Sequence, residues 1–340
     1  GTIQLNGGGT SSGTYDVDSG ATLNFNVHTL NATSAVVGSG NVTLAPTGGQ
    51  FVTLAGNYAV TGTTTITGAA TFNMASVTFP TLIQSGTLDG SANVTIPAGG
   101  TFTISPAGYH GGTGTTTINA TANLTINGMQ LARSLVNQGN AIWAGGSVTL
   151  DTGGSFTNAN SFSVTSAGGT FDAPFVNQLG AVVNRSTAGS SAFTSSFNNI
   201  GSVTNSSGTL SLTAAQVSGT TLTGGTWLVS GSGILNLSGS NLTTIGSGAN
   251  VTLNGPTATF PKLNTLTTNQ GTFSLQNGRT FIATADFTNT GALSVDATSK
   301  LQSGLAGQVS LWSAEGDGND SVGINNGTLV NATATAAGRL

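Results

Sequence analysis

Short segments in which apolar residues alternate with Thr, Ser or Asn follow one another along most of the chain. Clear examples are ATLNFNV (21–27), SFSVT (161–165) and GILNL (233–237). This period of two is typical of half-buried β-strands, and β-branched Thr suits the outward side of a pleated sheet. Gly pairs and Pro separate the segments as turns. Residues 132–138 and 212–217 could each form a helical turn, but no stretch sustains helical spacing, so we predict an all-β fold.

A repeated phrase, in which an apolar residue stands two positions before Asn, sets the spacing of the predicted strands. Its anchors Leu135, Phe156, Phe175 and Phe197 lie about 21, 19 and 22 residues apart. Three short strands and their turns use about 20 residues and raise the chain by one strand spacing of roughly 4.8 Å. We therefore predict a parallel β-helix, or β-solenoid, with a coil of about 20 residues, in which like side chains stack above one another. The predicted core stack consists of Leu135, Phe156, Phe175, Phe197 and Phe287.

Asn recurs at one place in these phrases, and Thr recurs in tracts. Asn tolerates the left-handed region and bonds to neighbouring backbone groups, which predicts a ladder of turns. The predicted ladder residues are Asn137, Asn158, Asn177, Asn199, Asn269 and Asn289. Thr tracts such as 61–67 are similar to the hydroxyl faces of ice-binding solenoids, which need one Thr-x-Thr per coil. Because the tracts recur only at a longer period of about 52 residues, we predict no such face.

The composition narrows the function. Among 340 residues there are 6 Lys and Arg, 10 Asp and Glu, 2 His and no Cys. So few charged and titratable side chains leave little for acid–base catalysis or cofactor binding. A net charge of -4 does not provide the basic surface that binding of nucleic acid requires. The apolar runs are far shorter than a membrane span, so we predict no membrane insertion. We expect neither an enzyme nor a cofactor-binding protein, and we interpret the chain as an interior piece of a longer polypeptide.

Few side chains could carry chemistry. His28 and His110 have no acidic or Cys partner nearby in sequence and are predicted to be turn or surface residues. Arg133 and Arg185 stand alone, and Arg279 is interpreted as a loop charge.

Two other residue sets leave alternatives open. Asp16 and Asp18 alternate on a predicted strand and share one side of it, either as solvated carboxylates or as a weak cation site. Aromatic residues stack either in the core or, if they face outward in a row, on sugars. The residues in question are Tyr58, Tyr109, Trp143, Trp227 and Trp312.

Phrases such as GTYDVDSGATLNF (13–25), GGSVTLDTGGSFTN (145–158) and FNNIGSVTNSSGTLSL (197–212) make up most of the chain. This region, residues 1–305, resembles the low-charge repeats of very large bacterial surface proteins of the haemagglutinin or autotransporter-adhesin type. The resemblance implies a right-handed parallel β-helix, export to the cell surface or extracellular space, and roles in adhesion or extracellular fibres.

The remaining segment, 306–340, differs from the repeats and is similar to the opening strand and loop of a laminin-G-like, concanavalin-type jelly roll. Its loop EGDGND places oxygen ligands at alternating positions, as a hard cation such as calcium requires; a solvated loop is the competing interpretation. The candidate calcium ligands are Glu315, Asp317, Asn319 and Asp320.

Together these features predict a structural, extracellular β-solenoid rod of a large surface or matrix protein, which associates with itself into fibres or lateral bundles. The first alternative is a carbohydrate-binding adhesin stalk that contacts glycans or a host or neighbouring cell. The second is a β-helix polysaccharide lyase or hydrolase, which would require several carboxylates that converge on one face.

Overall fold

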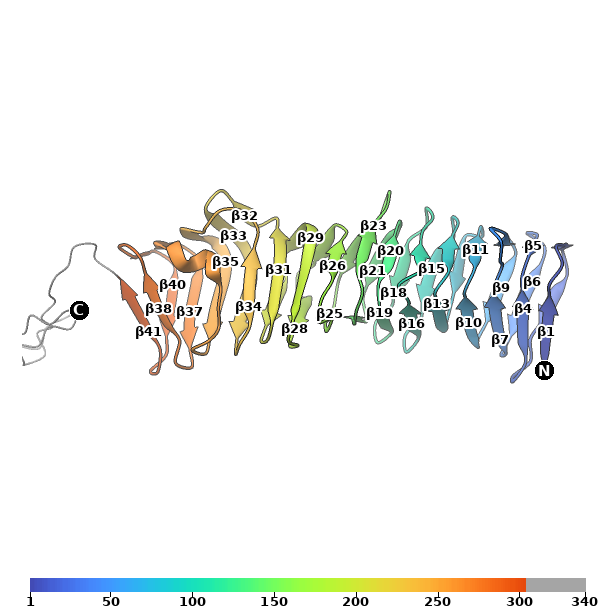
Figure 1. Ribbon diagram of the computed structural model, residues 1–340, viewed down its shortest axis with the longest axis horizontal. Coiled ribbons are helices and arrows are strands. Elements are labelled where there is room, and N and C mark those ends of the chain that lie inside the picture. Colours follow the sequence, from blue (N-terminus) through green and yellow to red (C-terminus); the bar gives the residue numbers. More distant parts are fainter. Residues whose placement is uncertain (304–340) are drawn as a thin grey trace, which may run out of the picture.

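The alternating pattern folds into a long stack of short parallel strands (Figure 1). The computed structural model describes residues 1–303. These residues form a parallel β-solenoid of about 14 turns of roughly 21 residues. Coil length varies, because the distance in sequence between paired residues of successive coils is shorter for Asn123 and Asn140 than for Ser202 and Thr226. A rise of roughly 4.8 Å per coil gives a rod about 70 Å long.

Each coil places strands on three faces, which we call face A, face B and face C. Face A consists of β1 (Thr2–Leu5), β4 (Thr22–Phe25), β7 (Asn41–Leu44), β10 (Thr63–Ile66), β13 (Thr81–Gln84), β16 (Thr101–Ile104), β19 (Asn123–Ile126), β22 (Asn140–Trp143), β25 (Ser161–Val164), β28 (Val182–Arg185), β30 (Ser202–Asn205), the second halves of β33 (Thr221–Ser230) and β35 (Thr244–Asn254), β37 (Thr272–Gln276) and β40 (Ala292–Val295).

Face B begins with very short strands and continues to the end of the described chain. It consists of β2 (Thr10–Ser11), β5 (His28–Leu30), β8 (Phe51–Leu54), β11 (Ala69–Phe72), β14 (Thr87–Asp89), β17 (Tyr109–His110), β20 (Met129–Leu131), β23 (Val148–Leu150), β26 (Thr170–Asp172), the first half of β29 (Ser190–Asn199), β31 (Thr209–Ala214), β34 (Ile234–Leu237), β38 (Thr280–Ala283) and β41 (Lys300–Ser303).

Face C completes each coil before the chain returns to face A. It consists of β3 (Thr14–Asp16), β6 (Ala35–Gly38), β9 (Asn57–Val60), β12 (Ser76–Thr78), β15 (Asn93–Ile96), β18 (Thr116–Ile118), β21 (Ser134–Asn137), β24 (Ser155–Asn158), β27 (Phe175–Asn177), the second half of β29, the first halves of β33 and β35, β36 (Thr268–Asn269) and β39 (Thr288–Asn289).

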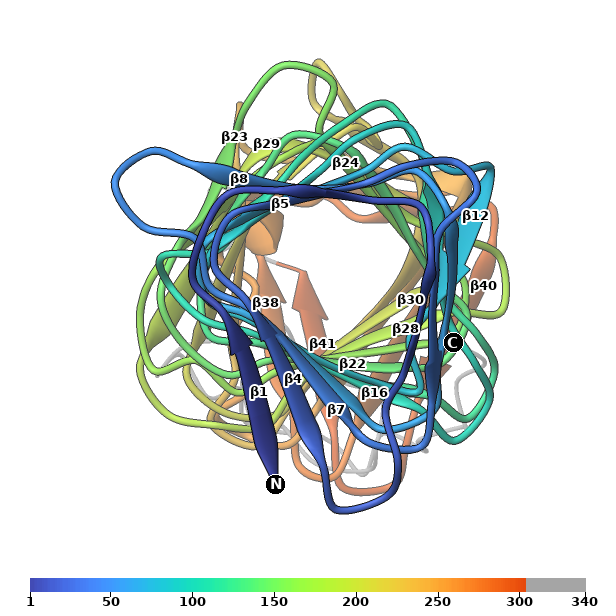
Figure 2. The same cartoon turned by 90° about the vertical axis from the view of Figure 1, so that its right-hand side faces the viewer.

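Seen from its N-terminal end, the chain winds clockwise as it recedes, so the coil is right-handed (Figure 2). Most connections are tight corners where backbones of successive coils almost touch. At one corner a Cβ atom on Gly62 would overlap the carbonyl of Gly40 in the coil below, so no side chain fits there. Gly is therefore abundant partly because the stacking is close, and not only because turns need positive φ.

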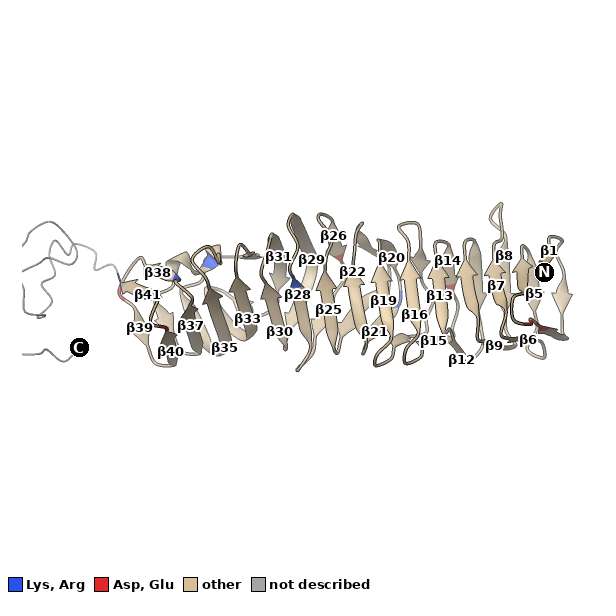
Figure 3. Cartoon of the chain, turned by 90° about the horizontal axis from the view of Figure 1, so that it is seen from below, with Lys and Arg blue, Asp and Glu red and all other residues tan. Residues whose placement is uncertain are grey.

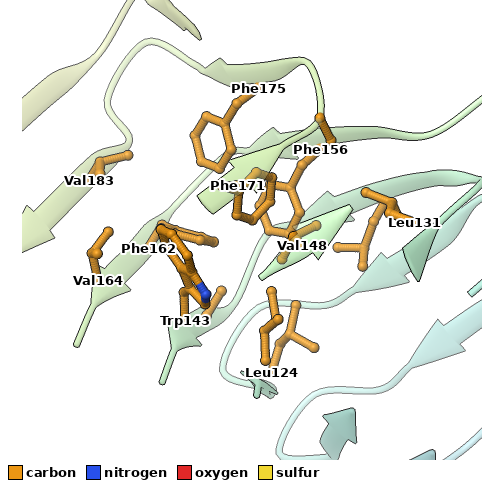
Figure 4. Packing of buried hydrophobic residues seen from close by; sticks show 14 of the residues in the cluster. Leu124, Leu131, Trp143, Val148, Phe156, Phe162, Val164, Phe171, Phe175 and Val183 are labelled. Atoms are coloured by element: carbon orange, nitrogen blue, oxygen red, sulfur yellow. The ribbon is translucent and has the colours of Figure 1, made fainter. Parts of the chain in front are cut away.

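The core is one continuous column of inward side chains (Figure 4). Leu135, Phe156, Phe175 and Phe197 pair in register in four successive coils. The rings of Phe156 and Phe175 lie 5.1 Å apart at an angle of 5°, and those of Phe175 and Phe197 lie 5.1 Å apart at 6°. Phe287 lies outside this column: it is half-buried near the end of the described rod, with its ring 6.5 Å from that of Phe273.

The structure departs from the regular coil at two places, and neither was predicted. β32 (Val217–Ser218) pairs antiparallel with the start of β33, and this hairpin adds residues to face C. A 3₁₀ turn, η1 (Pro261–Thr265), takes a strand position on face B. The suggested helical turns at 132–138 and 212–217 were wrong, because their inward residues alternate and lie in β21 and β31.

Candidate functional site

The outward side of face A is the largest regular surface of the rod. Each of its strands alternates inward residues, most of them apolar, with two outward residues, and pairing aligns the outward residues in two rows along the axis. The first row is Thr2, Thr22, Asn41, Thr63, Thr81, Thr101, Asn123, Asn140, Ser161, Val182, Ser202, Thr226, Asn250, Thr272 and Ala292. The second is Gln4, Asn24, Thr43, Thr65, Ile83, Thr103, Thr125, Ile142, Ser163, Asn184, Thr204, Leu228, Thr252, Ser274 and Ser294.

Every outward residue in these two rows is uncharged, and most are Thr, Ser, Asn or Gln. Arg185 ends β28 of face A, but its side chain points inward and is 0% exposed. Figure 3 shows how few charged residues occur along the described rod. Rows lie roughly 6.7 Å apart along a strand, and neighbours within a row roughly 4.8 Å apart. Thr occupies both rows only in β10 and β16, so Thr-x-Thr does not recur in every coil of face A, as expected from the sequence. Ser and Asn replace Thr in many coils, which hid the register in the sequence.

The predicted Asn ladder exists as a column of side-chain hydrogen bonds at the corner between faces C and A. The Nδ2 atom of Asn137 donates to Oδ1 of Asn158 at 2.9 Å. Asn158 donates to Asn177 at 2.9 Å, and Asn177 donates to Asn199 at 2.8 Å. Asn269 and Asn289 form a separate rung of 2.7 Å. Ile245, which pairs with Asn269, interrupts the ladder between the two parts.

Each rung also ties the corner to face A. Nδ2 of Asn177 donates to the carbonyl of Ser202 at 3.0 Å, and Nδ2 of Asn158 donates to that of Val182 at 3.1 Å. Of the two expected reasons for these Asn residues, left-handed backbone was wrong, because in residues 1–303 positive φ outside Gly occurs only at Thr121 and Asn277, whereas bonding to neighbouring backbone groups was confirmed. The ladder residues end extended strands; all except Asn289, which is exposed, are buried and donate to backbone carbonyls at the corner.

Both His residues are buried, which contradicts the predicted turn or surface location. His110 ends β17 with its ring inside the coil, where Nδ1 lies 2.9 Å from Oε1 of Gln84 and Nε2 lies 2.9 Å from Oγ1 of Thr116. Nε2 of Gln84 donates to the carbonyl of Tyr109 at 2.7 Å. This bond fixes the amide so that Nδ1 carries the proton. Burial, with the positive charge of Arg133 as a smaller cause, holds the pKa of His110 well below 6.5.

We expect the free energy of unfolding to decrease in acid because of His110. Its folded pKa is lowered, so the unfolded chain takes up the proton first as the pH falls. This stability is complete above the unfolded pKa of 6.5 and decreases below it, by at most about 1.4 kcal/mol per pH unit. Chemical denaturation across this range tests the slope. The variant His110→Gln should lose much of this dependence of the free energy of unfolding on pH. An unchanged slope in the variant would show that other groups cause the dependence.

The isolated Arg residues are structural. Arg133 is 2% exposed; its Nε donates to the carbonyl of Gly114 at 2.9 Å and its Nη2 to that of Ala92 at 2.6 Å. Burial lowers the pKa of Arg133 to about 10, and the charge of Asp89 opposes the shift. Arg185 likewise bonds inward, with Nη1 2.9 Å from the carbonyl of Ser166. These guanidinium groups donate to buried corner carbonyls, and that of Ser166 accepts a second bond from Oγ of Ser191 at 3.0 Å.

A smaller polar cluster lies in the first two coils. Oγ of Ser11 lies 2.7 Å from Nε2 of His28 and 2.6 Å from the hydroxyl of Tyr15. Burial lowers the pKa of His28, so the ring is neutral near pH 7. A neutral imidazole beside a serine hydroxyl supplies the base and the nucleophile of a catalytic arrangement, which also needs a third group to orient the base. Nδ1 of His28 has no hydrogen-bond partner, however, so no carboxylate orients the ring.

No group of three or more His, Cys, Asp or Glu residues that could hold a metal ion occurs among residues 1–303. Asp16 and Asp18 are both exposed on the same side of the chain, with buried Val17 between them. The candidate calcium ligands Glu315, Asp317, Asn319 and Asp320 lie outside the described residues, as does Trp312.

Most of the large aromatic residues face the core. Trp143 and Trp227 are 0% exposed, and Nε1 of Trp227 donates to the carbonyl of Gly224 at 2.8 Å. Tyr58 is buried with its hydroxyl 2.7 Å from Oγ1 of Thr64. Burial raises the pKa of Tyr58. Tyr109 is half-buried on the outward side of face B.

Within the described residues, no helix is long and apolar enough to cross a membrane. Comparison with protein-family models, curated proteins and solved structures found no match to this chain.

Proposed function

We propose that this chain is a structural rod of a large extracellular surface or matrix protein and that its role is mechanical. The observation that carries the proposal is the continuity of face A: its ladder of parallel strands runs from β1 to β40 with a pairing between every two successive coils. In such a stack each coil contacts only its neighbours, so stability is distributed along the axis. A load on the ends would meet many similar interfaces instead of one core.

The buried polar groups support this role. The Asn ladder, the His110 network and the two buried Arg residues all bond to corner backbone groups, so they fix the geometry of the coil. The repeats resemble those of large bacterial surface proteins, which is the ground for proposing an extracellular location. A carbohydrate-binding stalk would use outward rows of aromatic residues, whereas Tyr58, Trp143 and Trp227 are buried.

Single-molecule pulling on the chain from its two ends tests the mechanical role. We expect the length to be released in increments of one or a few coils, each coil of roughly 21 residues contributing roughly 70 Å. One rip that releases the whole described chain together would contradict the proposal, because it would show a single cooperative core.

The proposed location has its own test. Antibodies raised against the rod should label intact cells that express the natural protein, without permeabilisation. Labelling that requires permeabilised cells would contradict an extracellular role while leaving the fold untouched.

A further inference from the structure

We infer that face A is an interface and that its partner is face A of a second copy of this chain, so that two rods pair side by side along their axes. The inference rests on the proposed role as a structural rod. It starts from the two outward rows, which run from β1 to β40 and alternate with buried residues in every coil from β4 to β37. The antiparallel hairpin β32–β33 and the 3₁₀ turn η1 lie on faces C and B, so neither interrupts face A.

The area of face A is sufficient for a stable pair. A rod about 70 Å long and strands of four residues, about 13 Å wide, give roughly 900 Å². A specific interface of ordinary size buries about 800 Å² on each partner. Most outward side chains of the face are small, since Thr, Ser and Asn predominate in both rows.

The chemistry of the face favours a neutral partner with the same groups. The charged residues of the described chain all lie elsewhere or point inward: Asp16, Asp18, Asp89, Asp151, Asp172, Asp286, Asp296, Arg133, Arg185, Lys262, Arg279 and Lys300. Two copies can therefore approach without repulsion and without stripping water from ions. Hydroxyl and amide groups both donate and accept hydrogen bonds, so the face can complement itself.

Apolar contacts add to the hydrogen bonds. Ile83, Ile142 and Val182 point outward from face A with exposed fractions of 41%, 40% and 36%. Covering them on a second rod would remove apolar surface from water.

The repeat distance selects the second copy over other neutral partners. Two rods of the same chain share one coil spacing, so rows that align at one coil stay aligned along the whole length. A ligand with a different repeat would align over only a few coils. A two-fold axis between the rods makes the contact isologous, which closes the pair.

Sedimentation equilibrium of the full chain over a range of concentrations tests this inference. We expect the mass of a dimer for the natural sequence. The variant Thr65→Lys, Thr103→Lys, Thr125→Lys places three charges in the N-terminal half of face A and should weaken pairing by roughly a hundredfold or more. The matched control Thr95→Lys, Thr117→Lys, Thr157→Lys places three charges at half-buried outward sites on face C and should leave pairing unchanged.

Three results would overturn the inference: a monomer at every concentration, equal loss of pairing in the two variants, or pairing that survives the face A variant. Circular dichroism and the pulling pattern of each variant separate this failure from failure of the rod itself. Variants that remain rods of natural length but do not differ in pairing would reject only the interface. Binding of a neutral polysaccharide by a monomeric rod would assign face A to that ligand and likewise reject the inference.

Discussion

Replacing Asn177 by aspartate should lower the free energy of unfolding by about 3–5 kcal/mol, because a buried charge would replace a buried donor. Nδ2 of Asn177 donates to three oxygens, those of Asn199, Ser202 and Ala181, at 2.8, 3.0 and 3.3 Å. In the variant an oxygen would face all three. Urea denaturation at neutral pH measures the loss, and the loss should shrink in acid as the buried carboxylate, whose pKa is raised by burial, becomes protonated.

Asn140→Asp is the matched control. Asn140 is exposed on face A, so the same change should alter stability by no more than about 0.5 kcal/mol. Equal losses in the two variants would show that the ladder contributes nothing beyond the general cost of adding a negative charge.

Replacing Phe175 by alanine should cost about 3–5 kcal/mol, since the cavity would lie in the middle of the core column. The side chain is 1% exposed. Its ring centroid lies 5.0–5.5 Å from those of Phe156, Phe162, Phe171, Phe193 and Phe197. Because coils interact only with their neighbours, faster hydrogen exchange should concentrate in the coils on either side of β27.

Phe51 supplies the comparison for that experiment. It begins β8 on the outward side and is 54% exposed, so Phe51→Ala should cost less than about 1 kcal/mol. Faster exchange spread evenly along the rod in Phe175→Ala would contradict nearest-neighbour stacking.

The phrase around the Asn ladder allowed the fold to be predicted. Leu135, Phe156, Phe175 and Phe197 stand at nearly equal intervals, and equal intervals in a solenoid place residues above one another. The fold class was confirmed: residues 1–303 form an all-β parallel β-solenoid with almost no helix. Phe287 also stands two positions before an Asn, but the intervening coils break the column of Phe rings. The repeated phrase alone therefore did not predict where Phe287 lies.

The buried polar network could not be predicted because coil length varies. His110, Gln84 and Thr116 meet only because β13, β17 and β18 fall in neighbouring coils of unequal length. A shift of one residue would turn any of these side chains outward. Variation in coil length also concealed the rows of face A. Pairing fixes which positions of each strand face outward, but the residue type at those positions changes from coil to coil.

The assignment of 306–340 to a laminin-G-like neighbour and of residues 315–320 to calcium stays a prediction, since both lie outside the described residues. Isothermal titration of the full chain with calcium tests the second. A saturable heat that is lost in Asp317→Asn would support a site in that loop, and no heat would exclude one.

The most direct test of the stacked coil is a series of distances between spin labels along face A. The chain has no Cys, so pairs of single Cys residues can be introduced cleanly. With one label at Thr65 and the second at Thr103, Thr125, Thr204 or Thr252, we predict narrow distances that grow linearly by roughly 4.8 Å per coil. The longest pair, nine coils apart, should lie roughly 43 Å apart. Distances that do not increase with coil number, as in a sandwich of antiparallel sheets, would contradict the solenoid and every proposal built on it.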